Sequence, residues 1–401
     1  MTLAITFAAA LAALASAPSA AAAASPLPGL LRPQASASRS LVSLDGVWAF
    51  RTESYPGQGA AEGWASRPLA ASGPVLAMPV PSSYNDITQD AAVRDFVGVA
   101  WYETTAFVPR TWAGERVVLH FGSAHYYAQV FLDGAPLVEH DGGHLPFGAD
   151  VTASAAPGVA LRVTVALNNT LSPVTLPPGS VSTNNAGRTV QNVQMDFFNY
   201  AGIHRPVQLC SMPAAAYVDD VTVVVTLAGA TAFVRVDIAA GGAAASLSAA
   251  LRDAAGAVVA SNATAGPGNS ATLFLTVPNA NLWWPFLMSA TPAYLYLLEV
   301  SATDGAGVVD VYPLRVGLRT VTLAGTTLLL NGVPIYLRGF GKHEDAATRG
   351  KGMDQPTILK DSYLLQWFGA NSFRTVRHAA REARARARAC KAHEAHEARN
   401  D

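Results

Sequence analysis

The stretch RVVLHF at residues 116–121 decides the fold, together with the turn signal Asp133-Gly134 that follows it. Branched and aromatic side chains favour an extended strand, and Asp-Gly between apolar segments is typical of a β-hairpin. Residues 161–167, LRVTVAL, alternate with a period of two, as a half-buried strand does. Several such strands between residues 41 and 210 predict a β-sandwich, of the jelly-roll type.

A second set of strands follows a short linker at residues 212–216. Turn residues separate its members at regular intervals over about a hundred residues, which is typical of a small immunoglobulin-like sandwich. The predicted strands are residues 221–227, 233–238, 273–277 and 294–300.

The pattern changes again after Arg319. Asn331-Gly332 separates TLLL from VPIY within residues 327–336, which is the strongest hairpin signal in the chain. A helix should then begin at the N-cap Asp354 and end before Gly369. Residues 372–375, SFRT, indicate a strand, so strand, helix and strand predict the start of a parallel α/β domain.

Composition excludes several classes of protein. The formal net charge is −1 and 14% of the residues are charged, so we expect no nucleic-acid partner. Beyond residue 24, no apolar stretch is long enough to span a membrane, and we expect no membrane partner. Two cysteines, Cys210 and Cys390, provide no disulfide framework.

Residues 1–24 are nearly all apolar and end in small residues, which predicts a secretory signal peptide. The first basic residue is Arg32, so the usual charged start is missing. Two sequons, at Asn168 and Asn262, are predicted glycosylation sites. We therefore expect a secreted protein, either extracellular or lysosomal.

Ordered blocks along the chain carry a resemblance to a known family. Two of them are the most specific, DFFNYAGIHR at residues 196–205 and GKHED at residues 341–345. Across residues 41–375 the sequence resembles the β-glucuronidases of glycoside hydrolase family 2, and so many ordered matches are not expected by chance. The other blocks are LDGVWAF at 44–50, VPSSYND at 80–86, HDGGHLPF at 140–147 and GANSFRT at 369–375.

The resemblance implies a multidomain, mainly β architecture in the same order as the strand patterns. A jelly-roll β-sandwich that binds sugar is followed by an immunoglobulin-like β-sandwich and by the incomplete start of a (β/α)8 TIM barrel. The expected segments are a signal peptide at 1–24, the jelly roll at 25–212, the second sandwich at 213–320, the barrel start at 321–378 and a low-complexity tail at 379–401.

The resemblance also implies an activity, the removal of β-linked glucuronate with retention at the anomeric carbon. Such hydrolysis needs two carboxylates about 5–5.5 Å apart, and the family places both glutamates on later barrel strands. The family pattern breaks after Thr375, so we expect a truncated or frameshifted chain that holds no catalytic residue and is inactive as it stands. The implied partner is a carbohydrate substrate, a β-glucuronide; no cofactor is expected, and the full-length homologue is expected to be a homo-oligomer.

Two substrate-binding residues are inferred from the resemblance. Asp196 matches the acidic residue of the block at 196–205, where a carboxylate can accept hydrogen bonds from sugar hydroxyls. Without the resemblance, Asp196 is best interpreted as an ordinary aspartate in a turn or a helix cap. The match to the block favours a substrate-binding role instead. The family's substrate-contacting histidine falls on Arg377 in strict register, and on His378 if the register shifts by one residue.

Other polar and aromatic groups favour a structural interpretation. His343 and its acidic neighbours are more typical of polar packing at the top of the first barrel strand than of catalysis. The histidines of residues 393–396 are three apart rather than four, so no zinc helix and no metal site are expected. Trp283 and Trp284 are predicted in the core of the second sandwich.

Two alternatives stay open from the sequence. A non-catalytic carbohydrate-binding module or pseudo-enzyme would bind sugar without hydrolysis, and a β-galactosidase or β-mannosidase of the same family would prefer another sugar. In either case, a barrel start of one helix and two strands should expose the apolar residues Leu359, Trp367 and Phe368, and we expect this part to aggregate or to be cut by proteases.

Overall fold

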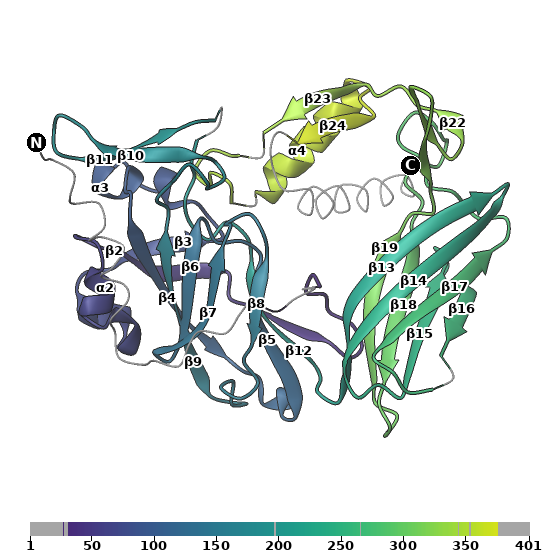
Figure 1. The fold of residues 1–401 in the computed structure, drawn as a ribbon, viewed down its shortest axis with the longest axis horizontal. Coiled ribbons are helices and arrows are strands. Elements are labelled where there is room, and N and C mark those ends of the chain that lie inside the picture. Colours follow the sequence, from purple (N-terminus) through teal and green to yellow (C-terminus); the bar gives the residue numbers. More distant parts are fainter. Residues whose placement is uncertain are drawn as a thin grey trace, which may run out of the picture.

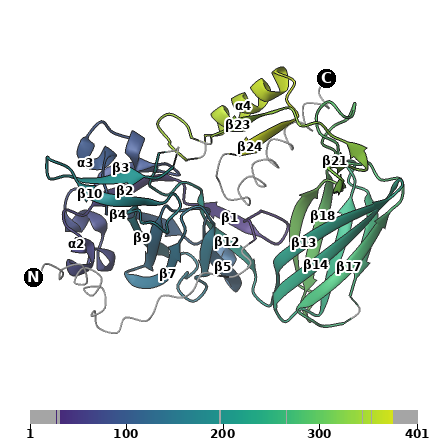
Figure 2. The ribbon, with the colours of Figure 1, turned by 45° about the horizontal axis from the view of Figure 1, so that its top comes forward.

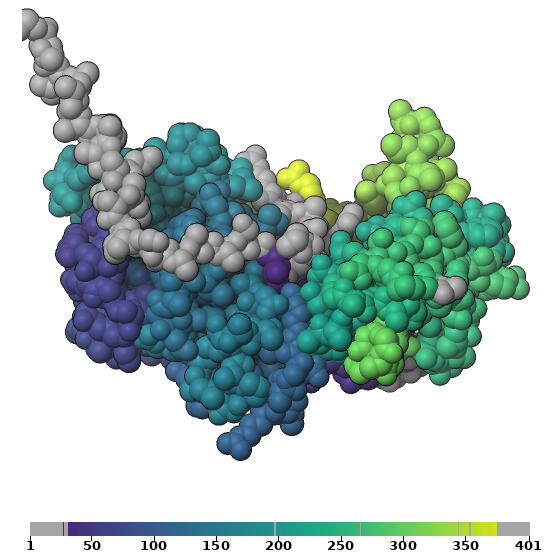
Figure 3. Space-filling view, turned by 60° about the horizontal axis from the view of Figure 1, so that its bottom comes forward, coloured from purple at the N-terminus to yellow at the C-terminus, as the bar shows by residue number. Residues whose placement is uncertain are grey.

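The computed structural model describes Leu27 and residues 31–195, 198–264, 266–343, 345–352 and 354–375. Figure 1 shows two β-sandwiches side by side, and a smaller unit of one helix and two strands that lies above and between them. The turned view in Figure 2 shows the same arrangement, and the space-filling view in Figure 3 shows the two sandwiches as separate lobes that meet near the middle. The multidomain, mainly β fold predicted from the strand patterns is confirmed.

The first sandwich consists of two antiparallel sheets. One has six strands in the order β3-β2-β4-β9-β6-β7, and the other has four in the order β1-β12-β5-β8. Non-consecutive neighbours in both sheets are the crossovers expected of a jelly roll. The bounds are β1 Ser40–Ser43, β2 Gly46–Thr52, β3 Leu76–Val80, β4 Val99–Phe107, β5 Glu115–Phe121, β6 Tyr127–Leu132, β7 Ala135–Asp141, β8 Phe147–Asp150, β9 Ala160–Asn168 and β12 Val207–Pro213.

Alternating side chains of both sheets fill the core between them. Phe50 of β2 contacts Tyr102 of β4 edge to face, with ring centroids 4.9 Å apart. In the facing sheet Phe121 of β5 stacks on Phe147 of β8, also at 4.9 Å. All four rings are fully buried, and the hydrophobic area they remove from water contributes to the stability of this domain.

The first sandwich also includes short helices and a hairpin outside its two main sheets. The helices are α2 Gln58–Ala61 and α3 Ala91–Arg94, and the hairpin of β10 Gly179–Thr183 and β11 Thr189–Val193 forms a separate two-stranded sheet. The chain returns from this hairpin to β12 through a loop at residues 194–206, which includes the block DFFNYAGIHR. The loop therefore connects this hairpin to β12, a strand of the four-stranded sheet.

The second sandwich pairs a three-stranded sheet, β13-β14-β17, with a four-stranded sheet, β16-β15-β18-β19. Buried side chains alternate strictly along β18, which is the pattern of a strand with one face on the core. The bounds are β13 Ala216–Ala228, β14 Thr231–Gly242, β15 Ser246–Arg252, β16 Val258–Ala263, β17 Ser270–Val277, β18 Tyr296–Thr303 and β19 Val309–Val316.

The tryptophan pair predicted in this core lies elsewhere. Trp283 is buried in a separate cluster with Leu330, and Trp284 packs at the edge of that cluster. The Arg319 guanidinium covers the Trp283 ring at 4.4 Å, and the Asn331 amide donates to the Trp283 carbonyl at 3.0 Å. The prediction of burial is right for Trp283, but the location is wrong, because the tryptophans join the second sandwich to the hairpin that follows it.

The barrel start has the predicted elements. Asn331 and Gly332 have φ values of 52° and 78°, as a tight turn between β21 Thr327–Leu330 and β22 Val333–Pro334 requires. The Asp354 carboxylate accepts from the Thr357 amide at 3.1 Å and caps α4 Gln355–Trp367. The strand β23 Gly339–Lys342 precedes α4 in the chain and β24 Ser372–Thr375 follows it, and the two strands pair in parallel. The strand β20 Val321–Ala324 comes before β21.

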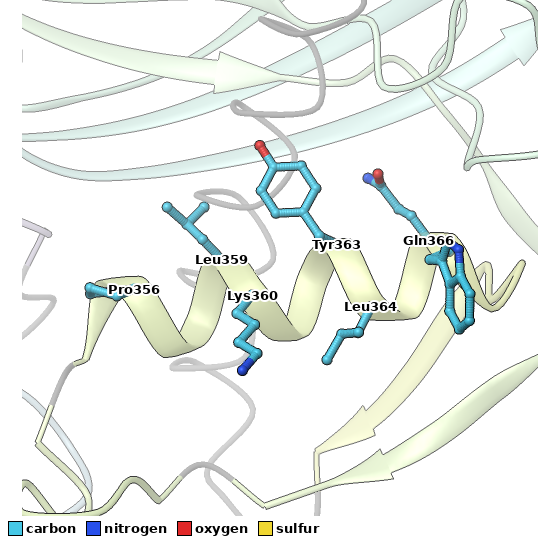
Figure 4. Close-up of a pocket in the computed structure, with 7 residues that line it drawn as sticks. Pro356, Leu359, Lys360, Tyr363, Leu364 and Gln366 are labelled. Atoms are coloured by element: carbon cyan, nitrogen blue, oxygen red, sulfur yellow. The ribbon is translucent and has the colours of Figure 1, made fainter.

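Helix α4 has no buried residue. Figure 4 shows Leu359 and Tyr363 on one side of the helix and Leu364 on another. The exposed fractions of Trp367 and Phe368 reach 79% and 63%. Leu359 is partly buried, so the predicted exposure of apolar side chains holds for the end of the helix more than for its beginning.

Candidate functional site

The loop that carries the block DFFNYAGIHR is fixed to the first sandwich by its backbone. The Ile203 carbonyl accepts from the Ser82 amide at 2.9 Å, and the Ala201 carbonyl accepts from the Tyr84 amide at 3.0 Å. Gly202 has a φ of 140°, and a Cβ there would lie 2.5 Å from the Ser82 carbonyl oxygen. Glycine is therefore required for the loop to approach this closely.

A turn of the barrel start, residues 345–352, contacts the same place. The Arg349 carbonyl accepts from the Ser83 amide at 3.0 Å, and the Ser83 hydroxyl accepts from the Lys351 amide at 3.2 Å. The Arg205 guanidinium donates to the Lys351 carbonyl. The 80–86 segment, the loop and the barrel turn thus meet at one junction, which we call the domain junction.

Three histidines are buried beneath the domain junction. The His125 ring lies between His144, with ring centroids 4.9 Å apart, and His204, at 5.6 Å. His125 Nε2 lies 2.7 Å from the Asn199 side-chain oxygen, and the His125 amide donates to the Gly202 carbonyl at 2.9 Å. The three side chains belong to the segment after β5, the turn between β7 and β8, and the loop before β12.

Burial lowers the pKa values of two histidines at the domain junction. Burial, followed by the nearby charges of His144 and Lys351, holds the pKa of His125 well below its usual value. Burial and the neighbouring His125 do the same to the pKa of His204. These histidines are therefore neutral near pH 7, beside the cations of Lys351 and Arg205.

The rim of the junction is aromatic and acidic. Phe198 is exposed and meets Tyr200 edge to face at 4.9 Å. Burial, and then the charges of Asp86 and Asp345, raise the pKa of the Tyr200 phenol. An exposed aromatic ring beside a phenol and carboxylates suits a polar ligand with an apolar face, such as a sugar ring.

Neither predicted substrate-binding residue can be placed. Asp196 and His378 both lie outside the described residues. Along the chain, the described residues Met195 and Phe198 stand on either side of the undescribed pair 196–197. His378 follows β24, which ends at Thr375.

The remaining sequence-based candidates have definite positions. His343 directly follows β23, and its side chain is exposed. The prediction that it packs against other polar groups is therefore wrong, because no described residue covers this end of the strand. Asn168 ends β9 and accepts from the Thr170 amide at 2.9 Å. Asn262 is exposed in the edge strand β16 and donates to the Phe274 carbonyl at 3.1 Å. Neither arrangement tests glycosylation.

The described part of the chain contains no set of three metal-binding side chains close enough to hold an ion. None of its helices is long and apolar enough to cross a membrane. The candidate site is the domain junction, which offers hydrogen-bonding groups, aromatic rings and buried imidazoles.

Sequence analysis missed the histidine cluster. His144 and His204 stand within two of the family blocks, but His125 lies outside those quoted, and nothing in their spacing suggests contact. The signal that could have pointed to them is the presence of histidines inside loop segments that are otherwise apolar or glycine-rich. Only the fold brings the three rings together.

Comparison with known proteins identifies the family. The model described as the sugar binding domain of glycosyl hydrolases family 2 matches residues 41–213. A second model of the same family matches residues 216–319, and its TIM barrel domain matches residues 321–383. The chain belongs to glycosyl hydrolases family 2. Within this family, the domain junction lies where the sugar-binding domain meets the beginning of the barrel.

Its similar relatives are β-glucuronidases. The mouse protein is 48% identical over 361 residues and the human protein is 46% identical over 365 residues, in each case over 86% of this chain. The chain spans about half the length of these curated relatives, 55%. A solved β-glucuronidase from Ruminococcus gnavus in complex with D-glucuronic acid has a TM-score of 0.78 and 36% identity, over 86% of this chain and 57% of the other.

Proposed function

We propose that this chain belongs to a hydrolase of β-glucuronides and that its domain junction forms part of the glucuronate site. The observation that carries the proposal is the identity of 46–48% with β-glucuronidases along 86% of the chain, in both sandwiches and the barrel start. The bound D-glucuronic acid of the Ruminococcus gnavus protein supports the choice of sugar.

The junction supplies recognition rather than bond cleavage in this proposal. Asp196 accepts hydrogen bonds from sugar hydroxyls, and Phe198 and Tyr200 offer an aromatic wall at the rim. Retaining hydrolysis needs an acid and a nucleophilic carboxylate, which the family resemblance assigns to later strands of the barrel. His378 would take part in binding where the chain leaves the second barrel strand.

Sugar preference tests the proposal on the 401-residue chain. We expect saturation-transfer NMR to show binding of methyl β-D-glucuronide and weaker binding of the methyl β-galactoside and β-mannoside. Asp196→Asn should weaken glucuronide binding by about tenfold, ~1.4 kcal/mol, because a charge-assisted hydrogen bond is lost. Asp95→Asn is the matched control, since Asp95 is exposed and pairs with Arg94 on the surface.

Equal or tighter binding of the galactoside or mannoside would overturn the assignment to glucuronides. A chromogenic β-glucuronide separates the enzyme from the alternative binding module, because only the enzyme releases the chromophore. Turnover by the 401 residues alone would contradict the assignment of both carboxylates to later barrel strands.

A further inference from the structure

The buried histidine cluster has a feature that sugar binding does not explain. The Asn199 amide nitrogen donates to the Asn169 carbonyl at 3.3 Å and to the Gln191 side-chain oxygen at 3.4 Å. These two acceptors orient the amide so that its oxygen faces His125. His125 Nε2 is therefore the donor in the 2.7 Å hydrogen bond, and the proton of the neutral ring is on Nε2.

This tautomer leaves Nδ1 of His125 without a proton. Nδ1 is buried and has no hydrogen-bond partner among the described residues, and the same is true of His204 Nε2. A Cβ at Gly143 would lie 2.6 Å from Nδ1, so the backbone closes over it. A proton that binds there would place a positive charge inside the domain junction, with no hydrogen-bond acceptor for it among the described residues.

Among the residues that the structure describes, the groups that face these two rings offer such a charge no counter-ion. His144 faces His125 from the turn between β7 and β8, and its Nε2 donates to the Leu176 carbonyl at 2.8 Å. Arg205 approaches from the loop before β12, and Lys351 from the barrel turn. The phenol ring of Tyr126 meets His125 edge to face at 5.2 Å. Among the described residues, the charged neighbours that act on the two rings are cationic or can become so.

We propose that His125 and His204 form a proton-sensitive latch, which is closed while the rings are neutral and opens the domain junction when they are protonated. In the closed state His125 holds the loop through Asn199 and Gly202, and the Arg205 guanidinium donates both to the His204 carbonyl and to the barrel turn. Opening would let the imidazoles reach water and would release the loop that carries Asp196 and the turn at 345–352 together. The effect on sugar binding rests on the proposed function, but the latch itself does not.

The direction of the pH effect follows from proton linkage. An imidazole in the open state has its ordinary pKa of about 6.5, whereas the closed state depresses that value. The open state therefore binds more protons, and below about pH 6.5 the opening constant rises about tenfold per pH unit for each histidine. The latch is stable above pH 6.5 and loses its stability progressively as the pH falls.

Hydrogen exchange measures this opening directly in the 401-residue chain. The reporting amides are those of Ser82, Ser83, Tyr84 and Lys351, which donate across the junction. After correction for the intrinsic pH dependence of exchange, their protection should fall steeply between pH 7 and pH 5. Amides of the central strands β4 and β9 should keep theirs, because the core of the sandwich stays folded.

Histidine variants test how many protons are taken up when the latch opens. His125→Gln keeps an amide nitrogen that can donate to Asn199 but cannot be protonated, so the pH slope should drop by about tenfold per pH unit. His204→Gln should lower the slope by the same amount and serves if the first variant folds poorly. His120→Gln is the matched control, because burial lowers the pKa of His120 to about 4 but its ring lies on the outer face of β5, beside Cys210 and Leu27.

Constant protection of the reporting amides from pH 7 to pH 5 in the wild-type chain would overturn the latch. An unchanged slope in both His125→Gln and His204→Gln would do the same. Loss of glucuronide binding at low pH in the wild type, but not in His125→Gln, would extend the latch to the sugar site. Absence of glucuronide binding at every pH would count against the proposed function, while the exchange slopes would still decide the latch.

Discussion

Arg39 and Asp310 form a buried ion pair that ties the two sandwiches together. The Arg39 guanidinium donates to both carboxylate oxygens of Asp310, at 2.6 and 2.9 Å, and to the Val218 carbonyl at 2.6 Å. The Val218 amide and the Ser38 hydroxyl donate to the same carboxylate at 2.8 Å. Both charges are almost completely buried, and each hydrogen bond offsets part of the cost of removing them from water.

Breaking this pair should be costly. We expect Arg39→Ala to lower the free energy of unfolding by about 3–5 kcal/mol, because it leaves the Asp310 charge buried without a partner. Denaturant unfolding, followed by a probe in each sandwich, measures the loss. Arg94→Ala is the control, since the exposed Arg94–Asp95 pair should contribute less than about 1 kcal/mol. A loss below 1 kcal/mol for Arg39→Ala would show that water replaces the guanidinium.

At the scale of elements, α4 is a helix without a covering layer. Its N-cap and its length follow the sequence pattern, but none of its thirteen residues is buried. Leu364 and Trp367 are exposed and line the open apolar surface of this helix. A helix in a (β/α)8 barrel normally buries such a face against strands and neighbouring helices.

Trp367 should therefore promote self-association. We expect Trp367→Lys to increase the monomer fraction of the 401-residue chain several-fold, because it removes the most exposed aromatic side chain of this helix. Light scattering coupled to size exclusion measures the fraction. Tyr55→Lys, at an exposed tyrosine of the first sandwich, is the matched control and should have no effect. If the two variants have the same monomer fraction, self-association depends on a surface other than that of Trp367.

At the scale of the whole molecule, the barrel turn is held by close approach to the first sandwich. Gly350 has a φ of 53°, and a Cβ there would lie 2.5 Å from both the Ser83 hydroxyl and the Tyr200 ring. The turn, the loop and the 80–86 segment can therefore meet only because this position lacks a side chain. The same contact places the barrel start beside the rim of the candidate sugar site.

Gly350→Ala should undock the turn. We expect limited proteolysis within residues 345–352 to accelerate by about tenfold or more, since the variant adds a steric clash to the strain of a left-handed alanine. Gly325→Ala is the matched control, because Gly325 has a similar φ of 58° and nothing within 4 Å of its Cβ position. If both variants are cut at the wild-type rate, the turn is held by contacts other than this one.

Local patterns in the sequence determined the elements. Runs of apolar and branched residues predicted several strands of each sandwich, Asn331-Gly332 predicted the turn between β21 and β22, and Asp354 predicted the start of α4. These features depend on residues close together in the chain, so they are visible without the fold. The block at residues 196–205 likewise pointed to the loop at the candidate site, although Asp196 itself lies outside the described residues.

Only the tertiary structure decided the long-range contacts. Arg39 and Asp310 are separated by 271 residues, and His125 and Asn199 by 74. Whether a charged or titratable side chain is exposed, paired or buried depends on segments that meet only after the sheets have formed. The histidine cluster and the domain junction therefore left no periodic signal in the sequence, because their partners are set by the packing of distant loops and not by spacing along the chain.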